Sequence, residues 1–158
     1  MRIGQSEDIH RLIEGRDLIL GGVKIRSDLG LLGHSDADVL THAIIEALIG
    51  AMGLGDIGKH FSDKDDRYKD ISSLILLDRT YEMLCERGYK VINVDALVMI
   101  EKPKLAPYIA RMQRNIALHL HTDVTNINIK ATCAEGLGFI GERKGAKAQA
   151  VVLIDELD

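Results

Sequence analysis

Asp8, His10 and His42 are residue types that could bind one metal ion. Asp8 and His10 are separated by one residue in a strand-like segment, so their side chains leave the same face of the strand. His42 lies in the helix predicted for residues 35–52, where apolar residues recur at helical spacing. Two imidazoles and one carboxylate supply the protein ligands of an open zinc site, which leaves a fourth position for water or substrate. The alternatives are an isolated D-x-H pair without metal and a histidine that packs in or caps the helix.

A second polar group lies at the start of the same predicted helix. His34 and Ser35 precede it, where unpaired backbone N–H groups and the helix dipole favour an anion. Ser35 and Asp38 also resemble a capping box, with Asp in place of the usual Glu or Gln. Asp38 and Glu46 lie one turn on either side of His42. They could hold its distal N–H, unless they are solvated charges on the helix surface.

Two further segments combine small or rigid residues with charge. The segment "ATCAEGLGFIG", residues 131–141, follows a predicted strand, and its glycines let backbone N–H groups approach a ligand. Its Glu135 could hold a hard cation or be a solvated loop residue. The segment "IEKPKLAP", residues 100–107, carries Lys102 and Lys104. These could bind phosphate or provide a base, or they could be ordinary surface lysines.

Strands and helices alternate along the chain. Strands are predicted at residues 1–10, 17–25, 90–100, 124–132 and 147–157, and helices at 35–52, 71–87 and 106–120. Residues 53–70, rich in glycine and then in charge, should form a long, exposed and mobile loop, as lids often do. We therefore expect a single α/β domain over residues 1–158, built as an α+β sandwich. Its mixed sheet should have four to five strands in a ferredoxin-like topology, with helices packed on one face.

Composition narrows the class of protein. The chain of 158 residues is 46% hydrophobic and 28% charged, which is typical of a globular protein. Its net charge of −4 argues against a broad nucleic-acid-binding surface. Cys85 and Cys133 are far apart, which predicts two reduced thiols rather than a disulfide framework. We find no apolar run of membrane-spanning length and no signal peptide, so we expect a cytoplasmic protein without a membrane partner.

Five segments together carry a combined signature. They are "DIH" at 8–10, "HSDADVLTHAIIEAL" at 34–48, "GLGDIGKHFSDKD" at 53–65, "KPKLAPYI" at 102–109 and "KATCAEGLGFIG" at 130–141. In order and spacing they resemble the 2-C-methyl-D-erythritol 2,4-cyclodiphosphate synthase family of the non-mevalonate isoprenoid pathway. The resemblance implies a phosphorus–oxygen lyase that acts on 4-diphosphocytidyl-2-C-methyl-D-erythritol 2-phosphate. The 2-phosphate of this substrate attacks the β-phosphorus, closes a cyclic diphosphate and expels CMP.

The same resemblance implies roles for individual residues. The Zn2+ ligands would be Asp8, His10 and His42, and Glu135 would bind Mg2+ or Mn2+ together with the substrate. The catalytic residues would be His34, Cys133 and Glu135. Relatives commonly carry threonine at position 133, and a thiol is a weaker hydrogen-bond donor. The residues implied to contact the substrate are Asp8, Ile9, His10, His34, Ser35, Asp56, Ile57, Gly58, Phe61, Ser62, Asp63, Lys64, Asp65, Ile100, Lys102, Pro103, Lys104, Leu105, Ala106, Thr132, Cys133, Ala134, Glu135 and Phe139.

The resemblance also implies a homotrimer with each active site between neighbouring subunits. Two other functions stay open at this point. A zinc phosphohydrolase would use the same metal ligands to activate water, and it would need Asp38 or Glu46 as its base. A non-catalytic trimeric scaffold would hold a structural zinc, but such sites are usually closed by four protein ligands and only three converge here.

Overall fold

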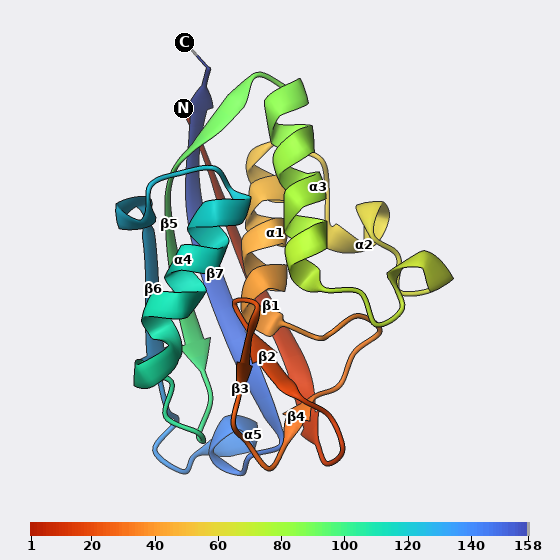
Figure 1. Cartoon of the computed structure of the whole chain (residues 1–158), viewed down its shortest axis with the longest axis vertical. Coiled ribbons are helices and arrows are strands. Elements are labelled where there is room, and N and C mark those ends of the chain that lie inside the picture. The colour runs from red at the N-terminus through yellow and green to blue at the C-terminus, as the bar shows by residue number, and fades with distance from the viewer. Residues whose placement is uncertain (158) are drawn as a thin grey trace.

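In residues 1–157, which the computed structural model describes, a mixed sheet of five strands forms one layer and helices cover one of its faces (Figure 1). The strand order is β4–β1–β7–β5–β6. The strands are β1 (Arg2–Ile13), β4 (Gly30–Leu31), β5 (Tyr89–Met99), β6 (Ile127–Thr132) and β7 (Gly145–Glu156). The covering helices are α1 (Val39–Ala51), α3 (Ser73–Glu86) and α4 (Ile109–His119). The predicted α+β architecture with helices on one face is therefore confirmed.

The predicted ferredoxin-like topology is wrong. That topology follows a β-α-β-β-α-β order, in which no helix separates the second and third strands. Here β5 and β6 are parallel and α4 joins them, because a parallel pair needs a long crossover connection. The last strand, β7, then lies between β1 and β5 and pairs with both in the antiparallel sense.

Several short elements were not predicted as such. The single strand expected at 17–25 is a hairpin of β2 (Leu18–Leu20) and β3 (Val23–Ile25), because Gly21 and Gly22 adopt φ of +54° and +69° and turn the chain. Residues 53–70 contain α2 (Ile57–His60) and a 3-10 helix (Asp66–Tyr68), and Tyr68 is buried. The segment is mostly exposed, as predicted, but it contains these two short helices and one buried side chain; its mobility stays a prediction. The other short helices are α5 (Gly138–Gly141) and the 3-10 turns Ala106–Tyr108 and Val124–Asn126.

The first long helix begins four residues later than predicted. Asp38 is the N-cap of α1, and its side chain accepts a hydrogen bond from the backbone N–H of Thr41. The expected capping box that began at Ser35 is therefore wrong, because a capping carboxylate already lies at Asp38. As a result His42 lies in the first turn of the helix and not two turns inside it.

Small residues let α1 approach the sheet closely. Gly4 of β1 faces α1, and a Cβ atom there would lie 1.9 Å from the carbonyl oxygen of Ala47. Ala146, Ala148 and Ala150 of β7 are also buried beneath the helix layer. This close packing also brings the first turn of α1 near the inward-facing side chains of β1.

The opposite face of the sheet has no helix over it in the single chain (Figure 1). It exposes apolar side chains, among them Ile3 (70% exposed), Ile9 and Val151. Charged pairs accompany them, such as Glu7 with Lys147 at 2.7 Å. Exposed apolar patches of this kind often mark sites of interaction with other proteins.

Two features bear on the exclusions drawn from composition. Cys85 and Cys133 are free thiols, and Cys133 is exposed. Among residues 1–157, none of the helices has the length and apolar character needed to cross a membrane.

Candidate active site

The ligand atoms of Asp8, His10 and His42 form a small triangle between β1 and α1. The Oδ2 atom of Asp8 lies 3.0 Å from Nε2 of His10 and 3.4 Å from Nδ1 of His42. The two histidine nitrogens are 3.2 Å apart. Asp8 and His10 lie on the inward row of β1, and α1 packs against this strand with His42 in its first turn. The structure therefore brings together the three residues predicted to bind a metal.

The dimensions of this triangle suit a tetrahedral metal ion. Ligand atoms at about 2.0–2.2 Å from zinc are separated by about 3.3–3.6 Å in a tetrahedron. The observed sides of 3.0, 3.2 and 3.4 Å are close to this range. Lone pairs at such distances repel one another unless a cation or a proton lies between them. Three protein ligands would leave one coordination position for substrate, as in catalytic zinc sites.

The backbone orients His10 for this role. Its Nδ1 lies 2.7 Å from the carbonyl oxygen of Leu32, which can only accept, so in the neutral ring Nε2 keeps a lone pair. Burial by itself lowers the pKa of His10, but the hydrogen bond to Asp8 and its charge raise that pKa above its ordinary value. Burial by itself raises the pKa of Asp8, yet hydrogen bonds from both histidines hold it well below its ordinary value. A proton is therefore the natural competitor of a metal ion here.

The two carboxylates expected to hold the distal N–H of His42 have other partners. Asp38 is fully buried, and its oxygens accept from the backbone N–H groups of Gly21, Gly22 and Thr41 and from the Thr41 hydroxyl. Glu46 accepts from the hydroxyl of Ser6 at 2.9 Å and from the N–H of Ile57. The interpretation that either carboxylate orients His42 is therefore wrong. Both carboxylates instead fix loops against α1.

A cavity of about 440 Å3 opens over the triangle. Gly33, Tyr68 and Leu76 line it but were not predicted to belong to the site. In the sequence, only its place beside His34 could have indicated Gly33. In the structure, a Cβ atom at this position would lie 3.1 Å from the His10 ring. The predicted residues that line the cavity are Asp8, His10, His34, Ser35, His42, Ile57, Gly58, Phe61 and Asp63.

His34 and Ser35 lie in this cavity but not at an open helix N-terminus. The capping carboxylate of Asp38 already occupies the start of α1, so the expected anion site on free helix N–H groups is wrong. His34 Nε2 lies 2.9 Å from the carbonyl oxygen of Asp65 and therefore donates to it. Ser35 Oγ lies 3.1 Å from Nε2 of His42. Ser35 thus contacts a histidine of the metal triangle, whereas His34 binds the backbone of the segment that contains Asp65.

Other predicted substrate residues do not line this cavity. Ile9 points to the open face of the sheet and is 50% exposed. Asp56 caps α2 by accepting from the N–H of Lys59, and Asp65 pairs with Arg67 at 2.6 Å. The hydroxyl of Ser62 accepts from the N–H of Lys64. Their contact with substrate stays a prediction.

The strand ends of β5 and β6 border a second cavity of about 430 Å3. Ile109 and Ala131 line it without having been predicted, and Glu101 lines it as part of the segment 100–107 singled out from the sequence. The predicted residues that line it are Ile100, Pro103, Lys104, Leu105, Ala106, Thr132 and Cys133. Because no residue is common to the two cavities, one chain does not join them into a single site.

Glu135 lies on an exposed turn beside the second cavity. It adopts φ of +53°, and Cys133 Sγ lies 3.7 Å from its Oε1 atom. The carboxylate of Glu101 accepts from the N–H groups of Ala134 at 2.9 Å and Gly136 at 3.1 Å. Glu101 lies within the segment 100–107 singled out from the sequence, but its role in holding the turn around Glu135 was not predicted. Phe139 lies elsewhere, in a hollow with Ile9 and His10 of β1.

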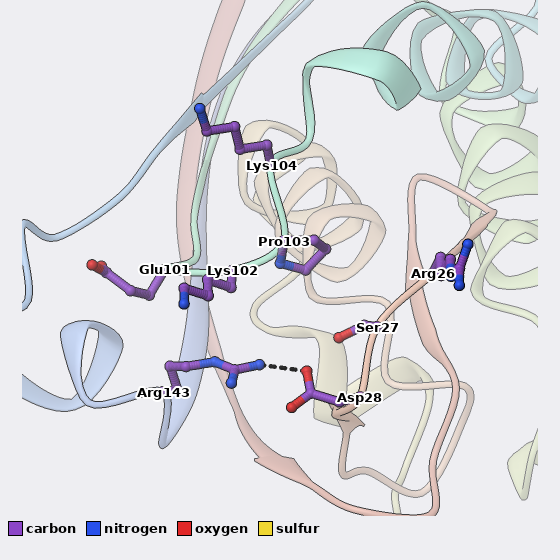
Figure 2. A pocket seen from close by; sticks show the side chains of 8 residues that line it. All are labelled: Arg26, Ser27, Asp28, Glu101, Lys102, Pro103, Lys104 and Arg143. Atoms are coloured by element: carbon purple, nitrogen blue, oxygen red, sulfur yellow. Dashed lines mark hydrogen bonds and ion pairs between the residues drawn. The ribbon is translucent and has the colours of Figure 1, made fainter.

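Figure 2 shows a third cavity, of about 740 Å3, on the other side of the loop after β5. Arg143 donates to the carboxylate of Asp28 at 2.5 Å across it. Lys102 lines this cavity and not the second one, while Lys104 borders both and extends away from the Asp28–Arg143 pair (Figure 2). The two lysines predicted to act together therefore lie in different surroundings.

Comparison with known proteins identifies the family. The sequence model of the YgbB family matches residues 1–155. The chain belongs to the YgbB family. A relative from Natranaerobius thermophilus, named 2-C-methyl-D-erythritol 2,4-cyclodiphosphate synthase, is 55% identical over 157 residues, which are 99% of each chain.

Solved structures resemble this YgbB-family chain in fold as well. The bifunctional IspDF of Campylobacter jejuni matches with a TM-score of 0.95 and 42% identity. The match covers 99% of this chain and 42% of that longer protein. A CDP complex of IspF from Plasmodium falciparum matches with a TM-score of 0.86 and 34% identity, over 99% of this chain and 97% of that one. The YgbB-family match includes the metal triangle and both smaller cavities.

Proposed function

We propose that this YgbB-family protein is a 2-C-methyl-D-erythritol 2,4-cyclodiphosphate synthase. Its substrate would be 4-diphosphocytidyl-2-C-methyl-D-erythritol 2-phosphate, and its products the cyclic diphosphate and CMP. The observation that carries the proposal is the metal triangle of Asp8, His10 and His42 at the wall of a cavity. It occurs in a chain whose full-length relatives bear this enzyme name.

The metal triangle supports zinc as the resident ion. Two neutral imidazoles and a carboxylate suit zinc better than magnesium, which prefers oxygen ligands and keeps several waters. Bound there, zinc would supply a Lewis acid and a template for a phosphate oxygen. We propose Glu135 as a ligand for Mg2+ or Mn2+ that arrives with the substrate, because one exposed carboxylate holds such an ion poorly by itself.

The proposed reaction needs positioning more than a strong base. An oxygen of the 2-phosphate forms a bond to the β-phosphorus, and the bond from that phosphorus to the CMP oxygen breaks. The nucleophile is already anionic, so no proton has to be removed from it. The difficulty lies in holding two polyanions together and stabilising charge during the transfer.

Side chains around the first cavity support this positioning role. The hydroxyl of Ser35 lies at the metal triangle, and we propose that it donates to a phosphate oxygen. His34 donates to the carbonyl of Asp65 and so ties residues 61–65 to the cavity. We propose that residues 56–58 and 61–65 enclose the methylerythritol group and that His34 stabilises the transition state.

The second cavity is our proposed nucleotide pocket. Segments 100–106 and 132–135 would hold the cytidine and its phosphates, with Lys104 near the diphosphate. Support comes from the pocket itself, which backbone and small side chains of two strand ends form. Structures of two similar proteins are described as CDP complexes. Cys133 would line the phosphate region with a weaker donor than threonine.

We also propose that the chain is a single domain that assembles as a homotrimer, with each active site between two subunits. Two facts support the assembly: the metal triangle and the proposed nucleotide pocket border separate cavities in one chain, and the sheet exposes an apolar face. A neighbouring copy seated on that face could join the two cavities. The cytoplasmic location stays a prediction.

The rival functions fit less well. A zinc phosphohydrolase would need a base beside the metal-bound water, but Asp38 is buried under four hydrogen bonds and Glu46 binds Ser6 and Ile57. A structural zinc would be closed by a fourth protein ligand. Residues 1–157 offer a cluster of three.

The proposal is tested by measuring metal content and CMP release together. Purified protein should contain about one zinc per chain and release CMP from the diphosphocytidyl substrate when magnesium is present. His42→Ala should lose both zinc and activity and keep its fold. Full zinc occupancy in that variant, or no CMP release by the zinc-loaded parent, would contradict the proposal.

A further inference from the structure

A chain of hydrogen bonds leads away from the metal triangle through His42. Its Nε2, the nitrogen opposite the proposed metal ligand Nδ1, lies 2.8 Å from the hydroxyl of Ser73. The Ser73 hydroxyl in turn donates to Oδ1 of Asp36 at 2.5 Å. Ser73 is completely buried at the start of α3, 31 residues away from His42 in sequence.

The order of donors along this chain follows from the number of protons. A serine hydroxyl has one proton, and here that proton goes to the carboxylate of Asp36. The Ser73 oxygen can therefore only accept from His42, so Nε2 of His42 must carry a proton. In the neutral ring, Nδ1 then has a lone pair, and this lone pair faces Asp8 and His10.

Asp36 itself is held in place by the backbone. Its Oδ2 accepts from the N–H of Ser73 at 3.0 Å, and its Oδ1 accepts from the N–H of Asp38 at 3.1 Å. The cap residue of α3, Ser72, makes no side-chain capping bond, so Asp36 performs that role from another segment. One carboxylate thus fixes the start of α3 and the direction of the Ser73 hydroxyl.

We propose that Asp36 and Ser73 are positioning residues that select the metal-binding tautomer of His42. They act through the imidazole and do not touch the metal. Partners of this kind orient metal-ligating histidines and raise their basicity. The inference rests on the metal site of the proposed function, and it adds two residues from outside the ligand set.

The arrangement also has a consequence for Ser35. Its hydroxyl is the second one near Nε2 of His42, at 3.1 Å, and it accepts from the N–H of Ala37. Because Nε2 already carries a proton, Ser35 cannot donate to it. The Ser35 proton is therefore left for an anionic ligand in the cavity, in agreement with the proposed phosphate contact.

The test compares Ser73→Ala with Ser72→Ala, its neighbour without a side-chain capping bond. In zinc-free protein, nitrogen-15 NMR of the histidine rings reports which nitrogen of His42 carries the proton. Parent and Ser72→Ala should show the Nε2–H form, and Ser73→Ala should show a mixture of both tautomers. Zinc affinity, measured by competition with a chelator, should fall about 10- to 100-fold in Ser73→Ala and stay unchanged in Ser72→Ala.

The two measurements separate this inference from the proposed function. Parent-like tautomer and zinc affinity in a folded Ser73→Ala variant would overturn the inference and leave the synthase proposal untouched. A parent protein that binds no zinc would overturn the metal site, while the tautomer in zinc-free protein would still test the role of Ser73. Circular dichroism of each variant shows that it is folded.

Discussion

Glu101 accepts hydrogen bonds from the backbone on both sides of Glu135, through the N–H groups of Ala134 and Gly136. Glu135 adopts φ of +53°, a conformation that costs energy in a residue with a side chain and persists only where its surroundings hold it. The carboxylate of one proposed pocket segment therefore holds the turn that carries the proposed ligand for the second cation.

Glu101→Gln should lower turnover while zinc content stays at the parent level. The variant loses the charge and one of two acceptor oxygens, so one N–H beside Glu135 loses its partner. Displacement of a positioning turn by about 1 Å can reduce the rate by roughly 10- to 100-fold. Turnover at saturating magnesium measures the effect. Glu142→Gln is the control, because the carboxylate of Glu142 pairs with Lys144 on the surface; equal turnover in both variants would contradict the role of Glu101.

Gly4→Ala should destabilise the protein and weaken zinc binding together. Its Cβ would lie 1.9 Å from the Ala47 carbonyl oxygen and 2.8 Å from the Ala51 nitrogen, both backbone atoms of α1. Overpacking against backbone should lower the free energy of unfolding by about 3 kcal/mol. Because β1 and α1 carry the three ligands, their separation should also reduce zinc affinity.

Gly50→Ala in α1, the helix that Gly4 packs against, is the matched control for Gly4→Ala. Nothing lies within 4 Å of a Cβ atom there, and the residue is exposed. Alanine should raise the free energy of unfolding by about 0.5–1 kcal/mol, since it favours the helix over the unfolded chain. Urea unfolding measures both variants. Equal stability of the two would contradict the close packing of β1 on α1.

Without zinc, the stability of the protein should fall as pH rises through the neutral range. The folded pKa of His10 is raised, so its contribution is complete below its unfolded value of about 6.5 and is lost as pH passes the folded pKa. The pKa of Asp8 is lowered in the folded protein. The stability that this carboxylate contributes is therefore fully present above about pH 4, the pKa of an unfolded aspartate, and does not change across the neutral range.

Asp8→Asn tests this pH dependence because it removes the charge that raises the pKa of His10. With a chelator present to remove zinc, the parent should exceed the variant in unfolding free energy by more at about pH 6 than at about pH 8.5. A difference independent of pH would show that His10 does not interact with Asp8 in the metal-free protein.

Mixing two inactive variants tests whether each active site lies between subunits. His42→Ala damages the metal triangle, and Glu135→Gln damages the proposed second cation site. If trimers dissociate and reassemble at random from equal amounts, about one quarter of the interfaces should combine two intact halves and recover that share of activity. No recovery after verified subunit exchange would mean that both halves act within one chain.

The sequence predicts the ligand triangle well because its parts are local. The D-x-H spacing on a strand places two ligands on one face, and helical periodicity brackets the third. The predicted start of α1 was wrong. Asp38 acts as the cap because it is held by hydrogen bonds from Gly21 and Gly22, which belong to a hairpin distant in sequence.

Partners far apart in sequence were beyond the reach of local patterns. Ser73 lies at the start of another helix, and nothing in its sequence neighbourhood indicates a contact with His42. Glu101 likewise reads as one more charge in a loop until β5 and β6 pair and bring Ala134 beside it. The predicted ferredoxin-like topology was wrong for a similar reason, because strand pairing is decided by long-range packing.

The identity of the product tests the central claim most directly, because CMP release alone is shared by a cyclase and a hydrolase. Phosphorus NMR after incubation of the zinc-loaded protein and magnesium with the diphosphocytidyl substrate distinguishes the two. We predict two coupled phosphorus signals of a cyclic diphosphate, formed in step with CMP and absent with His42→Ala. Open-chain phosphates in place of the cyclic product would contradict the synthase and favour a phosphohydrolase.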